Sequence, residues 1–223
     1  MYKLLIAYIA LVHVFIAAVL LKPDLPNKVF AKLGVVKLRN PQLDRMLVYH
    51  SAMDSSIEPD ATIFLGDSIT QSLATASVAD KGINFGIGQQ TTREMLTALP
   101  TYKSLARVKK VYIAIGINDV LRGEVDGITE RFLQIAAHIP ASTSIIWSAI
   151  IPTLENRADT ATILKLRDET REFCKSLPNC KFIDTPSIFL DASGKPDPAN
   201  YLDGLHLSQK GYRLWIDALK SAS

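Results

Sequence analysis

The chain has 223 residues, 48% of them hydrophobic and 21% charged, which suits one globular domain with a substantial core and leaves too little chain for two. Its formal net charge is only +3, and its lysines and arginines are scattered instead of gathering into a basic stripe with interleaved aromatic residues. This distribution argues against nucleic-acid binding.

The first predicted element is an apolar stretch over residues 4–21, in which Tyr8 and His13 are the only polar interruptions. As a helix it would extend about 27 Å, close to the hydrocarbon thickness of a bilayer. No small-residue cleavage site follows it, so residues 1–21 are predicted to form an uncleaved transmembrane anchor rather than a secretion signal. The prolines and lysines of residues 22–39 predict a tether, and a domain is expected over residues 40–223.

Two observations bear on the side of the membrane that the domain faces. The basic residues just after the apolar stretch outnumber those before it, which by the positive-inside tendency predicts a cytoplasmic domain. Cys174 and Cys180, the only cysteines, have a spacing that permits a disulfide and hence an oxidising compartment, although two buried free thiols fit equally well. Because many proteins with such an N-terminal segment are exported, we expect a periplasmic or extracellular domain, with a cytoplasmic one as the alternative.

The predicted domain begins with a helix over residues 41–55. Short apolar runs typical of buried strands follow, and amphipathic runs between them predict helices. The strands are expected at 61–65, 82–85, 110–115, 144–150 and 181–183, and the helices at 69–77, 92–99, 123–138, 158–177 and 208–219. Continuously apolar strands separated by helices imply a parallel sheet of about five strands covered on both faces, so the fold class is a three-layer α/β/α sandwich.

Functional groups of an open parallel sheet gather beyond the carboxyl ends of its strands, where Ser68, Gly86 and Asn118 all fall. Gly66 is expected to let the chain turn sharply out of the first strand. Ser68 then begins a helix, where free amides and the helix dipole favour developing negative charge, so it is the predicted nucleophile. Asp67 is expected to cap that helix.

A nucleophilic serine needs a base, and the base needs an acceptor that fixes its tautomer. His206 and Asp203 fit these roles, because they are three residues apart on a tight segment before the last predicted helix. The side-chain amide of Asn118 and the backbone N–H of Ser68 are expected to stabilise the oxyanion of the tetrahedral intermediate. Asp119 is expected to brace the loop after the third strand.

Four ordered segments carry a family resemblance: Gly66-Asp67-Ser68, and residues 84–88, 116–119 and 203–206. Over about residues 61–219 they resemble the blocks of the GDSL or SGNH hydrolase superfamily, and the second block is most similar to the branch with the platelet-activating-factor acetylhydrolase catalytic subunits. The resemblance implies a flavodoxin-like fold and hydrolysis of carboxylic esters. It assigns Ser68 as nucleophile, His206 as base and acid, Asp203 as orienting acid and Asn118 to the oxyanion hole.

The chain departs from this family in its second block. The family glycine whose amide enters the oxyanion hole corresponds to Gln89, and Gln90 replaces the acidic residue often found next. Because the donor is a backbone N–H, Gln89 is expected to supply it, with Gly86 in the supporting loop.

The expected function is therefore that of a membrane-tethered serine esterase that removes short acyl groups, acetyl above all, from a small-molecule, glycan or lipid carrier. Lysophospholipid and thioester hydrolysis are the enzymatic alternatives. A non-catalytic glycan- or lipid-binding module, whose Gln89–Gln90 loop blocks turnover, is the alternative of another class. No cofactor or metal is expected, because the serine mechanism requires no ion and the cysteines lack a nearby histidine pair. The oligomeric state is left open.

Overall fold

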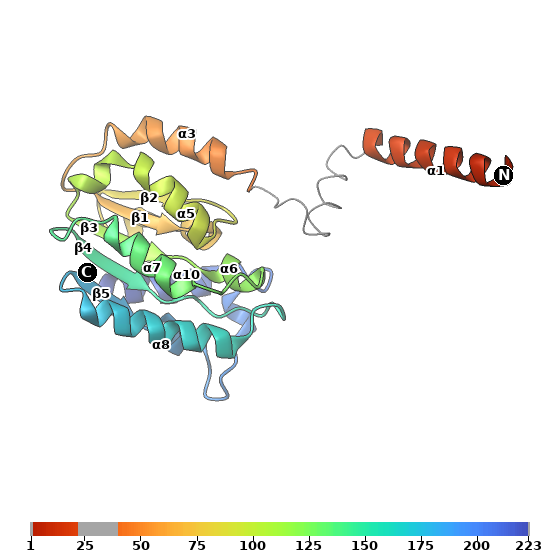
Figure 1. Ribbon diagram of the computed structural model, residues 1–223. Helices are drawn as coiled ribbons and strands as arrows, with labels where there is room; N and C mark the ends of the chain where they lie inside the picture. Colours follow the sequence, from red (N-terminus) through yellow and green to blue (C-terminus); the bar gives the residue numbers. More distant parts are fainter. Residues whose placement is uncertain (1, 22–39, 223) are drawn as a thin grey trace. The chain divides into compact units, whose positions relative to one another are not determined.

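The computed structural model describes residues 2–21 and 40–222, and the chain divides into two units, Met1–Asn40 and Pro41–Ser223 (Figure 1). In the first unit, helix α1 (Tyr2–Leu21) covers the predicted anchor. Among the residues described, however, no helix has both the length and the apolar character required of a membrane span. The predicted transmembrane helix is therefore not supported and stays a prediction. The predicted tether lies outside the described residues.

The second unit contains a five-stranded sheet, as predicted. Its strands are β1 (Thr62–Gly66), β2 (Gly82–Gly86), β3 (Lys110–Ala114), β4 (Ser144–Ser148) and β5 (Cys180–Ile183), all parallel and in the order β2-β1-β3-β4-β5. Gly66 pairs with Gly86 on one side and with Ala114 on the other, so these three strands end level with one another. The strand order reverses beside β1, which makes the edge beyond Gly66 the expected place for a site.

The helices of this unit are α3 (Leu43–Asp54), α4 (Ser68–Gln71), α5 (Thr92–Ala98), α6 (Ile117–Leu121), α7 (Ile128–Ala137), α8 (Thr160–Ser176), α9 (Thr185–Phe189) and α10 (Gln209–Ser221). Helix α3 precedes the first strand, α4 to α8 lie between strands, and α9 and α10 follow the last strand. The short helices α6 and α9 were not predicted. The helix predicted from residue 123 begins only at Ile128, because Gly123 and Gly127 have positive φ values of 68° and 67° and turn the chain.

Aromatic side chains fill both faces of the sheet. On one face the ring of Trp147 packs edge-on against Phe132 of α7 and Phe173 of α8. On the other, Tyr112 stacks on Phe64 and its hydroxyl donates to the carbonyl of Leu219 in α10. Figure 1 accordingly shows α7 and α8 in front of the sheet and the fainter α10 behind it. The predicted three-layer α/β/α fold is confirmed.

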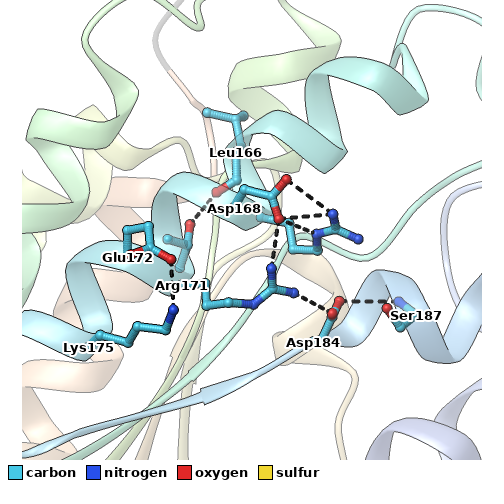
Figure 2. Close-up of polar contacts among 9 residues, drawn as sticks. Leu166, Asp168, Arg171, Glu172, Lys175, Asp184 and Ser187 are labelled. Carbon is cyan, nitrogen blue, oxygen red and sulfur yellow. Dashed lines mark hydrogen bonds and ion pairs between the residues drawn. The ribbon is translucent and has the colours of Figure 1, made fainter.

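A disulfide and an arginine connect α8 to β5 and α9, which follow it in the chain. Cys174 of α8 and Cys180 of β5 form a disulfide, which was one of the two predicted alternatives, the other being two free thiols. Figure 2 shows Arg171 of α8 between two carboxylates, with 2.8 Å to Asp168 and 2.5 Å to Asp184, which caps α9. The guanidinium also lies 5.2 Å from the centre of the Phe182 ring.

Candidate active site

Three predicted side chains meet beyond the carboxyl end of β1. Nε2 of His206 lies 2.9 Å from Oγ of Ser68, and Nδ1 of the same ring lies 2.7 Å from Oδ2 of Asp203. Both distances are within hydrogen-bond range. The contacts form a continuous chain from a carboxylate through an imidazole to a hydroxyl, which is the arrangement that allows a histidine to accept the serine proton.

The turn that carries Asp203 and His206 is shaped by the carboxylate itself. Oδ1 of Asp203 accepts the backbone N–H groups of Leu205 at 3.0 Å and His206 at 2.8 Å. The hydrogen bond from the His206 side chain, followed by that from its backbone, lowers the pKa of Asp203 to about 2. At neutral pH Asp203 is therefore ionised. The turn is held in place by Leu154, whose N–H donates to the carbonyl of Gly204 at 2.8 Å.

Asp67 and Gly66 bring Ser68 out of the strand. Asp67 caps α4 as predicted, with its side chain accepting the N–H of Ile69 at 3.0 Å, and its burial raises its pKa to about 7. Gly66 is not among the residues with positive φ, so a left-handed conformation is not what requires a glycine here. A Cβ at this position would instead collide with Oγ1 of Thr70 and the carbonyl of Ala114. Close packing therefore requires glycine at this position.

Gln89 occupies the turn that follows β2. Its φ is 62°, and a hydrogen bond of 3.1 Å from the Gln90 N–H to the Ile87 carbonyl closes the turn. Gln89 is thus the third residue of a type II turn, the position at which glycine is usual. A side chain in this left-handed region costs about 1 kcal/mol. Within the described part of the chain, the N–H groups of Gln89 and Ser68 donate no hydrogen bond. Both are therefore available as donors to an oxyanion.

Gly86 supports this turn from the end of β2. Its N–H donates to Oδ1 of Asn84 at 2.9 Å, and a Cβ on it would collide with the backbone of Gln71. The loop after β2 therefore packs closely against the end of α4.

Helix α6 places Asn118 and Asp119 against the same loop. Nδ2 of Asn118 donates to the Gln90 carbonyl at 3.0 Å, which leaves one N–H of this amide for an oxyanion. Asp119 is fully buried and accepts the N–H of Thr92 at 2.9 Å and its hydroxyl at 2.6 Å. Burial raises the pKa of Asp119, and these bonds oppose that rise. Asp119 thus connects α6 to the start of α5, whereas it was predicted to brace the loop after the third strand.

Two arginines that were not predicted as site residues complete this region. Arg131 of α7 is buried, donates to Oγ1 of Thr92 at 2.6 Å and lies 3.4 Å from Asp119. Arg122, at the end of α6, donates to the Gln89 carbonyl at 2.8 Å. A signal for Arg122 was present, because it follows Asn118 at the four-residue spacing that brings two side chains to one helix face.

A small, mostly apolar pocket adjoins Asp67. Its lining includes Ile69, Ile117, Ala149, Ile150 and Trp215.

The chain is similar to known proteins in sequence and in fold. Residues 64–214 match the model of the GDSL-like lipase/acylhydrolase family. A candidate platelet activating factor from Streptococcus pneumonia has a similar structure, with 21% identity, a TM-score of 0.71, and coverage of 81% of this chain and 92% of that one. A GDSL-like lipase from Bacteroides thetaiotaomicron has 18% identity, a TM-score of 0.67 and coverage of 79% and 96%.

A variant of Axe2, an acetyl xylan esterase from Geobacillus stearothermophilus, is also similar, with 20% identity, a TM-score of 0.61 and coverage of 73% and 94%. At these identities the three structures show the fold alone. No curated protein matches the chain.

Proposed function

From the premise that this chain belongs to the GDSL-like lipase/acylhydrolase family and is an ester-hydrolysing enzyme, we propose that it acts through a Ser68, His206 and Asp203 triad. The observation that carries the proposal is the contact of 2.9 Å between the Ser68 hydroxyl and the His206 ring, whose other nitrogen is bonded to Asp203. A nucleophile, its base and the group that orients the base are thus within direct reach of one another.

In the first half of the reaction, Oγ of Ser68 attacks the ester carbonyl carbon while Nε2 of His206 takes the hydroxyl proton. The carbonyl oxygen becomes an oxyanion, for which the backbone N–H groups of Ser68 and Gln89 and the side-chain amide of Asn118 are the proposed donors. Collapse of this intermediate breaks the ester C–O bond. The alcohol leaves with the proton from His206, and the acyl group stays on Ser68.

In the second half, water attacks the acyl carbon and gives its proton to His206. The second tetrahedral intermediate uses the same donors. Its collapse breaks the bond to Ser68 Oγ, which regains the proton as the carboxylic acid leaves. The negative charge of Asp203 stabilises the imidazolium that forms in each half.

We propose a short acyl group, acetyl above all, on a small-molecule or glycan alcohol. One observation supports this choice: the similar Axe2 protein is an acetyl xylan esterase.

The test is hydrolysis of a series of p-nitrophenyl esters from acetate to decanoate by the purified chain, with Ser68→Ala beside it. We expect the rate to be highest for acetate and to vanish in Ser68→Ala, while Ser221→Ala, at an exposed serine of α10, keeps the wild-type rate. Equal rates in the wild type and Ser68→Ala would refute the triad. A maximum at long chains would favour a lysophospholipase, and carrier binding without turnover would favour the non-catalytic module.

We further propose that this domain works in an oxidising, extracytoplasmic compartment. The support is the disulfide between Cys174 and Cys180, a bond that the reducing cytosol disfavours. Alkylation of the native protein with and without prior reduction, followed by mass spectrometry, tests this. Labelling of both cysteines without reduction would contradict the proposal. Membrane fractionation of the full chain tests the predicted anchor in residues 1–21.

A further inference from the structure

The turn after β2 keeps Gln89 in a backbone conformation that side chains normally avoid. Its φ of 62° is the only positive value at a non-glycine position in the described part of the chain. The angle φ describes rotation about the N–Cα bond, so its value decides where the N–H of Gln89 points relative to the rest of the turn. If φ relaxed to a negative value, the same N–H would be redirected.

Arg122 contacts this turn at the carbonyl of Gln89. Its Nη2 donates to the Gln89 oxygen at 2.8 Å, and its Nη1 lies 3.9 Å from Oε1 of Glu94. The other carboxylate oxygen of Glu94 accepts the N–H of Thr91 at 2.8 Å in the capping box of α5. Arg122 therefore connects the turn to the first turn of α5, and its side chain is only 28% exposed.

Arg122 acts together with Asn118. Asn118 donates to the Gln90 carbonyl at 3.0 Å and Arg122 to the Gln89 carbonyl, so two successive carbonyls of the loop are held from one helix. The peptide between Gln89 and Gln90 is bound at both ends, because its carbonyl accepts from Arg122 at 2.8 Å and its N–H donates to the Ile87 carbonyl at 3.1 Å. These two bonds fix the rotation of that peptide, and with it they hold Gln89 in its left-handed conformation.

We propose that Arg122 is a positioning residue of the oxyanion hole, which holds the Gln89 carbonyl so that the Gln89 N–H keeps the direction required for catalysis. The inference rests on the proposed function. Arg122 itself contacts no reacting atom, so its loss should lower kcat and leave KM nearly unchanged. A glycine at position 89 would need this support much less, because glycine adopts positive φ as readily as negative φ.

The experiment compares steady-state hydrolysis of p-nitrophenyl acetate by wild type, Arg122→Met, Gln89→Gly and the double variant. We expect Arg122→Met to lower kcat about tenfold with less than about a twofold change in KM, since one oxyanion donor is misdirected but not removed. In the Gln89→Gly background the same substitution should lower kcat less than about threefold. Arg213→Met, at an exposed arginine of α10, should match wild type.

Three results would overturn the role of Arg122: a wild-type kcat in Arg122→Met, an equal loss of kcat in both backgrounds, or a change confined to KM. If Arg122→Met does not fold, Arg122→Gln, whose shorter side chain falls short of the Gln89 carbonyl, is read in the same way. Ser68→Ala separates this inference from the proposed function. If it retains the wild-type rate, both are wrong, whereas an inactive Ser68→Ala beside an unaffected Arg122→Met refutes only the Arg122 role.

Discussion

Asp203 binds His206 through both carboxylate oxygens, one to the ring nitrogen Nδ1 at 2.7 Å and one to the backbone N–H at 2.8 Å. The first bond orients the imidazole toward Ser68, and the second shapes the turn on which the histidine stands. One carboxylate thus controls both the direction and the position of the proposed base.

Asp203→Asn should therefore lower kcat by about 10²- to 10⁴-fold, because an amide nitrogen cannot accept from Nδ1 and favours the wrong imidazole tautomer. The KM should change little. Steady-state kinetics on p-nitrophenyl acetate check this, with Asp217→Asn on the exposed side of α10 as the matched control. A kcat within about twofold of wild type would show that Asp203 does not orient the base.

Gln89→Gly should raise the free energy of unfolding by about 0.5 kcal/mol. The gain comes from relief of the side-chain penalty at a φ of 62°, reduced by the greater freedom of glycine in the unfolded chain. Urea denaturation measures the change. Gln134→Gly, in the exposed middle of α7, is the control and should instead lose about 1 kcal/mol. Equal losses at both positions would mean that Gln89 carries no backbone strain.

Arg131→Met should destabilise the protein by about 3 to 5 kcal/mol, because it leaves the carboxylate of Asp119 buried without its cationic partner. Replacing both residues, as Arg131→Met with Asp119→Leu, should cost less than Arg131→Met alone. Chemical denaturation of the three variants gives the comparison. Additive losses would contradict a coupled buried pair.

His50 should make stability depend on pH. It is buried against the Phe85 ring with Nδ1 2.9 Å from the Tyr102 hydroxyl, and burial lowers its pKa from the ordinary 6.5 to about 4. The unfolded chain therefore binds more protons between these values, and stability falls as the pH falls through this range. Between about pH 7 and pH 5 the contribution of His50 should drop by about 2 kcal/mol.

Other buried groups titrate in the same range, so the comparison with a variant is essential. Burial raises the pKa of Asp67 to about 7, and the stability that it contributes grows as the pH falls. The stability difference between wild type and His50→Phe cancels this effect. That difference should shift by about 2 kcal/mol over the pH interval, and a constant difference would exclude His50 as the source.

Arg171→Met should lower stability by about 1 kcal/mol, more than loss of an ordinary surface ion pair, because Arg171 pairs with both Asp168 and Asp184 (Figure 2). It also lies over the Phe182 ring. Added salt should reduce the difference from wild type. Lys175→Met removes a single exposed pair with Glu172 and should change stability by less than about 0.5 kcal/mol. Thermal or urea unfolding at two salt concentrations tests both, and equal effects of the two substitutions would contradict the network.

Local patterns predicted the elements that decide the architecture. The five strands lie within a few residues of their predicted ranges, because continuous apolar runs must be buried on both faces of a sheet. The predictions failed at short elements such as α6 and α9, whose five residues are too few to show a periodicity. They also failed to divide the predicted helix at 69–77, where the structure has α4 and a separate 3₁₀ turn, Thr75–Ser77.

Local composition and short spacings were enough to predict the fold class, the family blocks and candidate residues for a nucleophile, a base and its orienting acid. Tertiary structure decided the rest. It brought Ser68 to His206 across 138 residues, chose the disulfide over free thiols, and brought Arg122 to the carbonyl of a left-handed Gln89. The physical reason is that hydrogen bonds between distant segments form only after the sheet has aligned the ends of its strands.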